Sequence, residues 1–168
     1  RIILKSASSL DQLVDQAALF LHRAHNELPE LMRSRIETFY MKEDVLNGKQ
    51  VLIVDDDVRN LFALTTVLER YGLHVNIAES GREAIDIIEN KKNIDIVLMD
   101  IMMPEMDGYE TMRLIRSDEK NKDLTIIAVT AKAMKGDRQK CIESGASDYI
   151  TKPVNVDQLT SLMRVWLK

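Results

Sequence analysis

Short apolar runs alternate with amphipathic segments from residue 49 to the end of the chain. Runs rich in β-branched residues predict five strands, at residues 51–54, 74–78, 94–99, 125–130 and 148–151. The segments between them repeat apolar residues at helical spacing and predict helices at residues 58–71, 81–91, 109–117, 133–144 and 156–167. Three of the strands are almost continuously apolar, as central parallel strands buried on both faces are. The pattern predicts an α/β domain with a doubly wound, five-stranded parallel sheet of the flavodoxin-like type, in strand order 2-1-3-4-5.

The first 48 residues follow a different pattern. Ser9 and Gln12 have the spacing of a capping box, and apolar residues then recur at helical spacing up to the break at Pro29. A second helix is predicted at residues 30–42. This part of the chain is therefore expected to be a helical appendage without strands in regular alternation.

The turn-forming pair Asn47-Gly48 separates the two patterns. We place the boundary there, with an N-terminal helical segment or linker over residues 1–48 and the α/β domain over 49–168. A short similarity between the two ends of the chain leaves open whether the first part is a linker or the end of a preceding copy of the same fold. Because the chain begins with Arg1 instead of methionine, we expect that it was excised from a longer protein.

Charge and cysteine content narrow the function classes. The net charge is −4, from 27 acidic and 23 basic residues, which argues against nucleic acid as a partner. The single cysteine permits no internal disulfide and favours a reducing compartment. No apolar stretch is long enough for a membrane span, and no signal peptide opens the chain. A cytoplasmic domain without membrane contact is expected.

Aspartates follow two strands that this topology places side by side. Asp55, Asp56 and Asp57 come directly after the first predicted strand, and Asp100 comes after the third. Carboxylates brought together at one sheet edge repel one another unless a cation pairs with them. One to three carboxylates with room for water and phosphate oxygens are typical of a Mg²⁺ site for phosphoryl transfer.

Thr130 and Lys152 stand at the same edge, at the ends of the fourth and fifth strands. A threonine hydroxyl donates a hydrogen bond to a phosphoryl oxygen, and a lysine ammonium supplies a point charge. Acids after the first and third strands, a hydroxyl after the fourth and a lysine after the fifth are together what an aspartyl phosphate site requires.

These positions carry the motifs of a known family. The matching segments are Val-Leu-Ile-Val-Asp-Asp at 51–56, Leu-Met-Asp-Ile-Met-Met-Pro at 98–104, Met-Asp-Gly at 106–108, Val-Thr-Ala at 129–131 and Lys-Pro at 152–153. Residues 49–168 therefore resemble the receiver domain of two-component response regulators. Residues 131–134 and 145–149 narrow the resemblance to receivers attached to hybrid sensor histidine kinases.

The resemblance implies a phosphorelay function. Asp100 would be the phosphoacceptor, taking a phosphoryl group from a phosphohistidine of a histidine kinase or of a histidine phosphotransfer protein. Asp55, Asp56, Asp100 and the backbone carbonyl of Met102 would hold Mg²⁺ or Mn²⁺. The phosphoryl oxygens would be bound by Thr130 and Lys152, the latter preceding a cis proline bond.

The resemblance also implies an output. Tyr149 would be the switch aromatic, and the face of the fourth helix, fifth strand and fifth helix would respond and could form a dimer. A receiver catalyses its own phosphorylation and dephosphorylation without being a conventional enzyme, whereas the parent protein would be a histidine kinase. Met102 and Lys132 stand at the two positions that tune hydrolysis in the family. Because Met102 is apolar and cannot orient a water molecule, slow autodephosphorylation is expected.

Two alternatives remain at this stage. A pseudo-receiver would keep the fold as an interaction module without phosphorylation, but no acceptor, metal acid or lysine is missing here. Asp55 and Asp57 also fit the start of the haloacid dehalogenase phosphatase signature, although that family has Thr or Val where this chain has Arg59. As a receiver, the chain would use Asp57 as a helix cap only.

Overall fold

The computed structural model describes residues 45–91, 93–131 and 136–167. The helices predicted between residues 1 and 42 lie outside these residues, and so does Lys132. The compact unit that includes the sheet begins at Val45. Leu46 is fully buried in the core of this unit, just before the predicted turn. The domain boundary at residue 48 stays a prediction.

The described residues alternate strands and helices. The elements are β1 (Gln50–Val54), α3 (Val58–Glu69), β2 (His74–Ala78), α4 (Gly81–Asn90), β3 (Ile96–Asp100), α5 (Gly108–Ser117), the 3₁₀ helix η1 (Glu119–Asn121), β4 (Thr125–Thr130), α6 (Asp137–Glu143), β5 (Asp148–Thr151) and α7 (Val156–Trp166). The strands form one parallel sheet in the order β2-β1-β3-β4-β5. The predicted fold class and strand order are confirmed.

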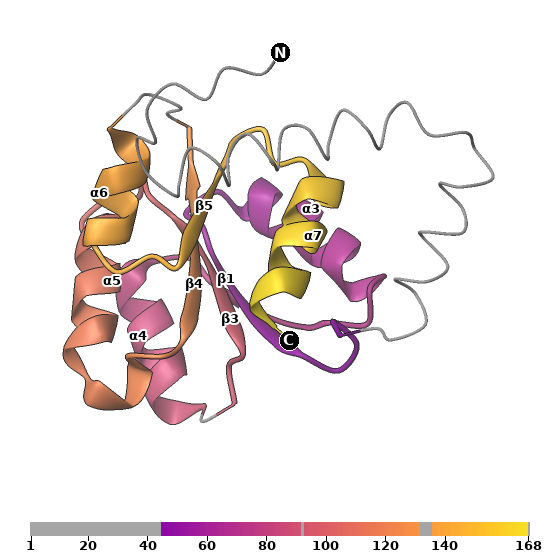
Figure 1. Ribbon diagram of the computed structural model, residues 1–168, viewed down its shortest axis with the longest axis horizontal. Helices are drawn as coiled ribbons and strands as arrows, with labels where there is room; N and C mark the ends of the chain where they lie inside the picture. Colours follow the sequence, from indigo (N-terminus) through magenta and orange to yellow (C-terminus); the bar gives the residue numbers. More distant parts are fainter. Residues whose placement is uncertain (1–44, 92, 132–135, 168) are drawn as a thin grey trace, which may run out of the picture. The chain divides into compact units, whose positions relative to one another are not determined.

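Helices cover both faces of the sheet (Figure 1). Helices α3 and α7 lie on one face, and α4 and α5 lie on the other. Successive residues of the central strands point to opposite faces, so that Leu98 joins the core under α3 and α7 while Met99 joins the core under α4 and α5. Burial on both faces explains why β3 and β4 consist entirely of buried residues. No helix in the described part of the chain is long and apolar enough to cross a membrane.

The structure moves the bounds of several predicted elements, most of them by one or two residues. Strand β3 begins at Ile96, not at residue 94, and ahead of it the Asp95 carboxylate accepts from the Gln50 backbone N–H at 2.8 Å. The strand includes Asp100 as its last residue, since Asp100 pairs with Val129 of β4. The described part of the fourth predicted helix starts at Asp137, and residues 133–135 lie outside the described residues.

Candidate functional site

Strand register brings the predicted residues to one edge of the sheet. Val54 at the end of β1 pairs with Met99 of β3, so that Asp55 and Asp100 come next on neighbouring strands. Thr130 at the end of β4 pairs with Thr151, and its carbonyl accepts from the Lys152 backbone N–H at 2.7 Å. The sheet thus presents side chains from four strand ends in one place, as the sequence predicts.

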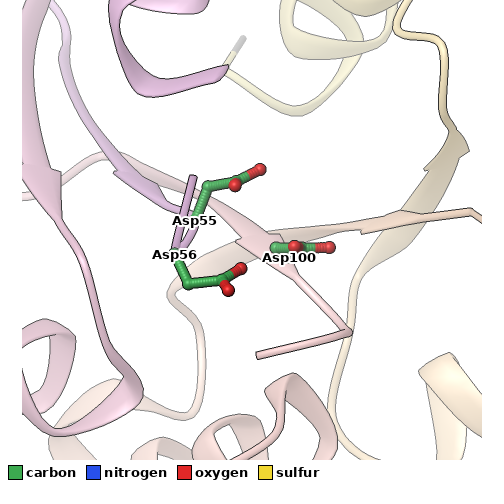
Figure 2. Close-up of side chains that lie close together, drawn as sticks. All are labelled: Asp55, Asp56 and Asp100. Carbon is green, nitrogen blue, oxygen red and sulfur yellow. The ribbon is translucent and has the colours of Figure 1, made fainter. Parts of the chain in front are cut away.

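Three carboxylates gather at this edge (Figure 2). One oxygen from each of Asp55, Asp56 and Asp100 lies within 4.8 Å of the others. Asp55 and Asp100 are buried, whereas Asp56 is exposed. Ligand oxygens of an octahedral Mg²⁺ ion lie about 3 to 4 Å apart, given metal–oxygen distances of about 2.1 Å. The donor type, the spacing and the open side at Asp56 therefore fit a hard divalent cation.

The Lys152 ammonium joins the two buried acids. Its Nζ lies 2.8 Å from Asp55 Oδ2 and 2.9 Å from Asp100 Oδ2. Burial by itself lowers the pKa of Lys152, but the hydrogen bonds to the two carboxylates outweigh it and raise the pKa above its usual value. The Lys152–Pro153 peptide bond is cis, which confirms the expectation from the resemblance.

Burial dominates the electrostatics of Asp100. Desolvation raises the pKa of its carboxyl above the usual value, and the neighbouring Lys152 offsets only part of this effect. The Met102 backbone N–H approaches Asp100 Oδ1 at 3.4 Å. A buried Asp100 carboxylate with one oxygen close to those of Asp55 and Asp56 is suited to bind a cation or to react with an electrophile.

Asp55 is held by a residue that the sequence analysis missed. The Asn60 side-chain amide donates to Asp55 Oδ1 at 3.0 Å and to Oδ2 at 3.1 Å. The Asp57 backbone N–H also donates to Asp55 Oδ1 at 2.9 Å. Asn60 lies in the first turn of α3, shortly after Asp55 and Asp56. This position is the feature of the sequence from which the contact with Asp55 could have been predicted.

Asp57 is a helix cap, as predicted. Its carboxylate accepts from the backbone N–H of Arg59 at 2.9 Å and caps α3. The hydrogen bonds from the Arg59 guanidinium and backbone lower the pKa of Asp57 to about 2. Asp57 is absent from the acidic cluster, which consists of Asp55, Asp56 and Asp100.

The first turn of α5 packs directly on β3. A Cβ at Gly108 would lie 2.2 Å from the Asp100 carbonyl oxygen and 2.8 Å from Ile101 Cα. The Gly108 N–H also donates to the Ile101 carbonyl at 3.0 Å. Only glycine permits this approach, which explains the glycine of the Met-Asp-Gly motif in physical terms.

The remaining predicted residues surround the acids. Thr130 is buried at the end of β4. Met102 is 59% exposed in the loop after β3. Tyr149 lies in β5, half-buried against the core under α4 and α5.

A pocket of about 420 Å³ opens beside the cluster. Its walls include Asp56, Met102, Thr130, Tyr109 and Lys140. A second hollow, of about 600 Å³, is lined by Asn47, Gly48, Lys49, Gln50, Asn93, Ile94 and Asp95, at the amino ends of β1 and β3. The acidic cluster is at the opposite ends of these strands, where Asp56 forms part of the wall of the smaller pocket.

Known proteins resemble this chain in sequence. Residues 51–164 match the response regulator receiver domain. Hybrid signal transduction histidine kinase I of Dictyostelium discoideum is 42% identical over 113 residues, which cover 64% of this chain and 6% of that protein. The sensor histidine kinase GacS of Pseudomonas protegens is 35% identical over 151 residues, 87% of this chain and 16% of that protein. The chain thus spans a small part of the length of these relatives.

Solved structures agree with the sequence matches. The receiver domain of sensor histidine kinase PA1611 from Pseudomonas aeruginosa, with magnesium coordinated in its active site cleft, has a TM-score of 0.66 and 33% identity, and the match covers 71% of this chain and 98% of that one. The co-crystal structure of the Saccharomyces cerevisiae phosphotransfer protein Ypd1 with the receiver domain of Ssk1 gives a TM-score of 0.67 and 30% identity, over 72% of this chain and 90% of that one. With this fold, acidic cluster and family match, the chain belongs to the response regulator receiver domain family.

Proposed function

We propose that this chain is a phosphoacceptor in a two-component phosphorelay, with Asp100 as the residue that is phosphorylated. The observation that supports this most strongly is the convergence of three carboxylates and Lys152 on one sheet edge, where Asp100 is buried. The similarity to receiver domains of sensor histidine kinases supports the same role. The parent protein is proposed to be a hybrid histidine kinase.

The proposed transfer is a displacement at phosphorus. An oxygen of Asp100 forms the new bond to the phosphorus atom of a phosphohistidine, and the bond from phosphorus to the imidazole nitrogen breaks. The imidazole leaves as a neutral ring after it takes up a proton. Asp100 has to be ionised to act, and Lys152 at 2.9 Å favours that form against the effect of burial.

A divalent cation is proposed to assist. Asp55, Asp56, Asp100 and the Met102 carbonyl would hold Mg²⁺ or Mn²⁺, which neutralises charge on the transferred phosphoryl group when it is bound. Asn60 keeps both oxygens of Asp55 in place through its side-chain amide. The open side at Asp56 leaves positions for water and phosphoryl oxygens.

Phosphorylation is proposed to switch the domain. The phosphoryl group adds strong acceptor oxygens and a charge of roughly −2 beside Thr130 and Lys152. A shift from 1:99 to 99:1 between two states needs about 5.5 kcal/mol. Two or three charge-assisted hydrogen bonds of about 1.5 to 3 kcal/mol each supply that amount. Tyr149 would repack in response, and the face of α6, β5 and α7 would change.

Exposed apolar side chains support two partner surfaces. Val58 and Phe62 are 58% and 74% exposed one helical turn apart on α3, the helix that follows Asp55 and Asp56, and are the proposed docking point for the phosphodonor protein. Ile142, Val165 and Trp166 are exposed on α6 and α7, where a dimer is proposed.

The proposed location is the cytoplasm. The unpaired thiol of Cys141 is compatible with the reducing conditions there.

The lifetime of the phosphorylated form is proposed to be long. Met102 and Lys132 occupy the two positions that tune hydrolysis, and the thioether of Met102 does not orient water as an amide would. The comparison of the chain with its Met102→Asn variant tests this proposal. A faster loss of phosphate in the variant is expected, and equal lifetimes would contradict it.

The two alternatives make different predictions. A pseudo-receiver takes up no phosphate, whereas a haloacid dehalogenase phosphatase takes it up on Asp55. Family membership argues against the phosphatase. In addition, Asp55 already accepts from Asn60, Asp57 and Lys152, which makes it a fixed ligand and a poor nucleophile.

Acetyl phosphate with Mg²⁺ tests the proposal directly. Intact-mass spectrometry of the chain should show one added phosphoryl group, and the mass should be unchanged in the presence of a chelator. Asp100→Asn should fold normally and take up no phosphate. Equal phosphate uptake by the Asn variant would refute Asp100 as the acceptor, and no uptake by the unmodified chain would favour the pseudo-receiver.

A further inference from the structure

Tyr109 links α5 to α6 through both its ring and its hydroxyl. It is the second residue of α5 and is only 8% exposed. The Lys140 ammonium of α6 lies 4.1 Å from the centroid of the Tyr109 ring, a cation–π contact. The Tyr109 hydroxyl also interacts with the thiol of Cys141, the next residue of α6, and both side chains lie in the same core cluster. Two neighbouring residues of α6 thus hold one aromatic side chain.

Helix α6 packs against β5 and buries little of its own surface. Of its seven residues, only Cys141 is buried. Gly136 at its N-terminus provides no side-chain cap. Beyond its C-terminus, the Arg116 guanidinium donates to the Gly145 carbonyl at 2.9 Å and anchors the loop that follows. The contact with Tyr109 therefore joins this helix to α5, in addition to the packing of α6 against β5.

The backbone of Tyr109 is coupled to the phosphoacceptor. Its neighbour Gly108 packs against the Asp100 carbonyl so closely that a Cβ would lie 2.2 Å from that oxygen. No side chain lies between the two backbones to absorb a displacement. Packed contacts of this kind have few alternative arrangements, so a shift of Asp100 has to move the first turn of α5.

We propose that Tyr109 is a positioning residue that couples α6 to Asp100 through Gly108, so that phosphorylation of Asp100 and the packing of α6 control each other. This inference rests on the proposed function and extends it to a second route between the acceptor and the α6 surface. Thermodynamic coupling is reciprocal. If phosphorylation changes the free energy of α6 packing by a given amount, a change in α6 packing changes the free energy of phosphorylation of Asp100 by the same amount.

The single cysteine of the chain gives a direct readout. Cys141 is fully buried, and burial raises the pKa of its thiol, so labelling by an aromatic disulfide reagent in the resting state is slow. The experiment labels the full chain with Mg²⁺, in the presence and absence of acetyl phosphate. Mass spectrometry of the same samples resolves the phosphorylated from the unphosphorylated molecules. We expect the labelling rates of these two forms to differ by about fivefold or more.

Tyr109→Phe tests the route. This variant keeps the ring beside Lys140 but loses the hydroxyl, so the difference in labelling between the two forms should fall to about twofold or less, with a changed half-saturating concentration of acetyl phosphate. Tyr71→Phe is the matched control, because Tyr71 also has a cation beside its ring, Arg164 at 5.8 Å, but packs against the opposite core. The control should keep the difference of the unmodified chain.

Three results would overturn the inference. One is equal labelling of Cys141 in phosphorylated and unphosphorylated molecules. Another is a Tyr109→Phe variant with the same difference as the unmodified chain. The third is no phosphate in the mass spectrum, which overturns the proposed function together with this inference and is thereby distinguished from the other two.

Discussion

Replacement of Lys152 by methionine should destabilise the metal-free domain strongly. In the structure its ammonium lies 2.8 Å from Asp55 and 2.9 Å from Asp100, whose side chains are only 4% and 5% exposed. Removal of one partner of a buried ion pair costs about 3 to 5 kcal/mol, because the remaining charge stays buried. Since the Lys152 side chain is still 26% exposed, we expect a value near the lower end, about 3 kcal/mol.

Thermal and urea unfolding measure this cost. For a domain of this size, about 3 kcal/mol corresponds to a decrease in Tm of roughly 10 °C. Lys49→Met is a matched control: Lys49 pairs with Asp95 at 3.4 Å, and their side chains are 37% and 33% exposed. An exposed pair of this type contributes less than about 1 kcal/mol, so the control should lose little stability.

The stability cost of Lys152→Met should also depend on pH and on Mg²⁺. Burial raises the pKa of Asp100, so the folded domain binds protons more readily than the unfolded chain. Protonation of Asp100 stabilises the folded domain fully below the ordinary carboxyl pKa of 3.8. This stabilisation is lost as pH rises through the raised pKa of Asp100 in the folded domain. Without Lys152 the pKa rises further, so the cost of the substitution should be smaller near pH 5 than near pH 8.

Mg²⁺ should offset part of the lost charge. With the ammonium gone, the ion no longer competes with it for Asp55 and Asp100, so Mg²⁺ should raise the Tm of Lys152→Met more than that of the unmodified chain. The reasoning is refuted if Lys152→Met and Lys49→Met lose the same stability, or if Mg²⁺ stabilises Lys152→Met no more than the unmodified chain.

Three further substitutions test other parts of the site. Asn60→Leu should cost about 1 to 3 kcal/mol in unfolding experiments and weaken Mg²⁺ binding several-fold in calorimetry, because both oxygens of Asp55 lose a donor; unchanged affinity would contradict this role. Gly108→Ala should destabilise the domain by about 1 to 3 kcal/mol and slow phosphorylation, since its Cβ meets the Asp100 carbonyl, whereas Gly136→Ala, with nothing within 4 Å of its Cβ, is the control. Phe62→Ala should change stability by less than about 0.5 kcal/mol and slow phosphoryl transfer from a phosphotransfer protein, but not from acetyl phosphate; equal effects on both donors would exclude Phe62 as a docking residue.

The hydrophobic pattern was sufficient to predict the sheet and the main site. Continuous apolar runs identify β3 and β4 because both faces of these strands are buried, and parallel strands bring the residues after them to one edge. Asp55, Asp100 and Lys152 directly follow predicted strands and Thr130 ends one. These positions therefore suffice to place the four residues at one edge of the sheet. The start of β3 was predicted two residues too early, because the apolar pattern includes Ile94.

Contacts that depend on helix packing could not be predicted in this way. Asn60 lies in a helix turn, and its amide reaches Asp55 only because α3 starts at Val58 and is capped by Asp57. The contact between Tyr109 and Cys141 joins two helices that are distant in sequence, and each residue alone has the pattern of an ordinary core position. The closeness of Gly108 to Asp100 likewise follows from the packing of α5, although its motif was recognised.

The position of the phosphoryl group is the most direct test of the central claim. Borohydride reduces an aspartyl phosphate to homoserine, which peptide sequencing by mass spectrometry locates. After treatment of the full chain with acetyl phosphate and Mg²⁺, the conversion should occur at Asp100 and at no other aspartate. Conversion at Asp55, or at none of the aspartates, would contradict the account.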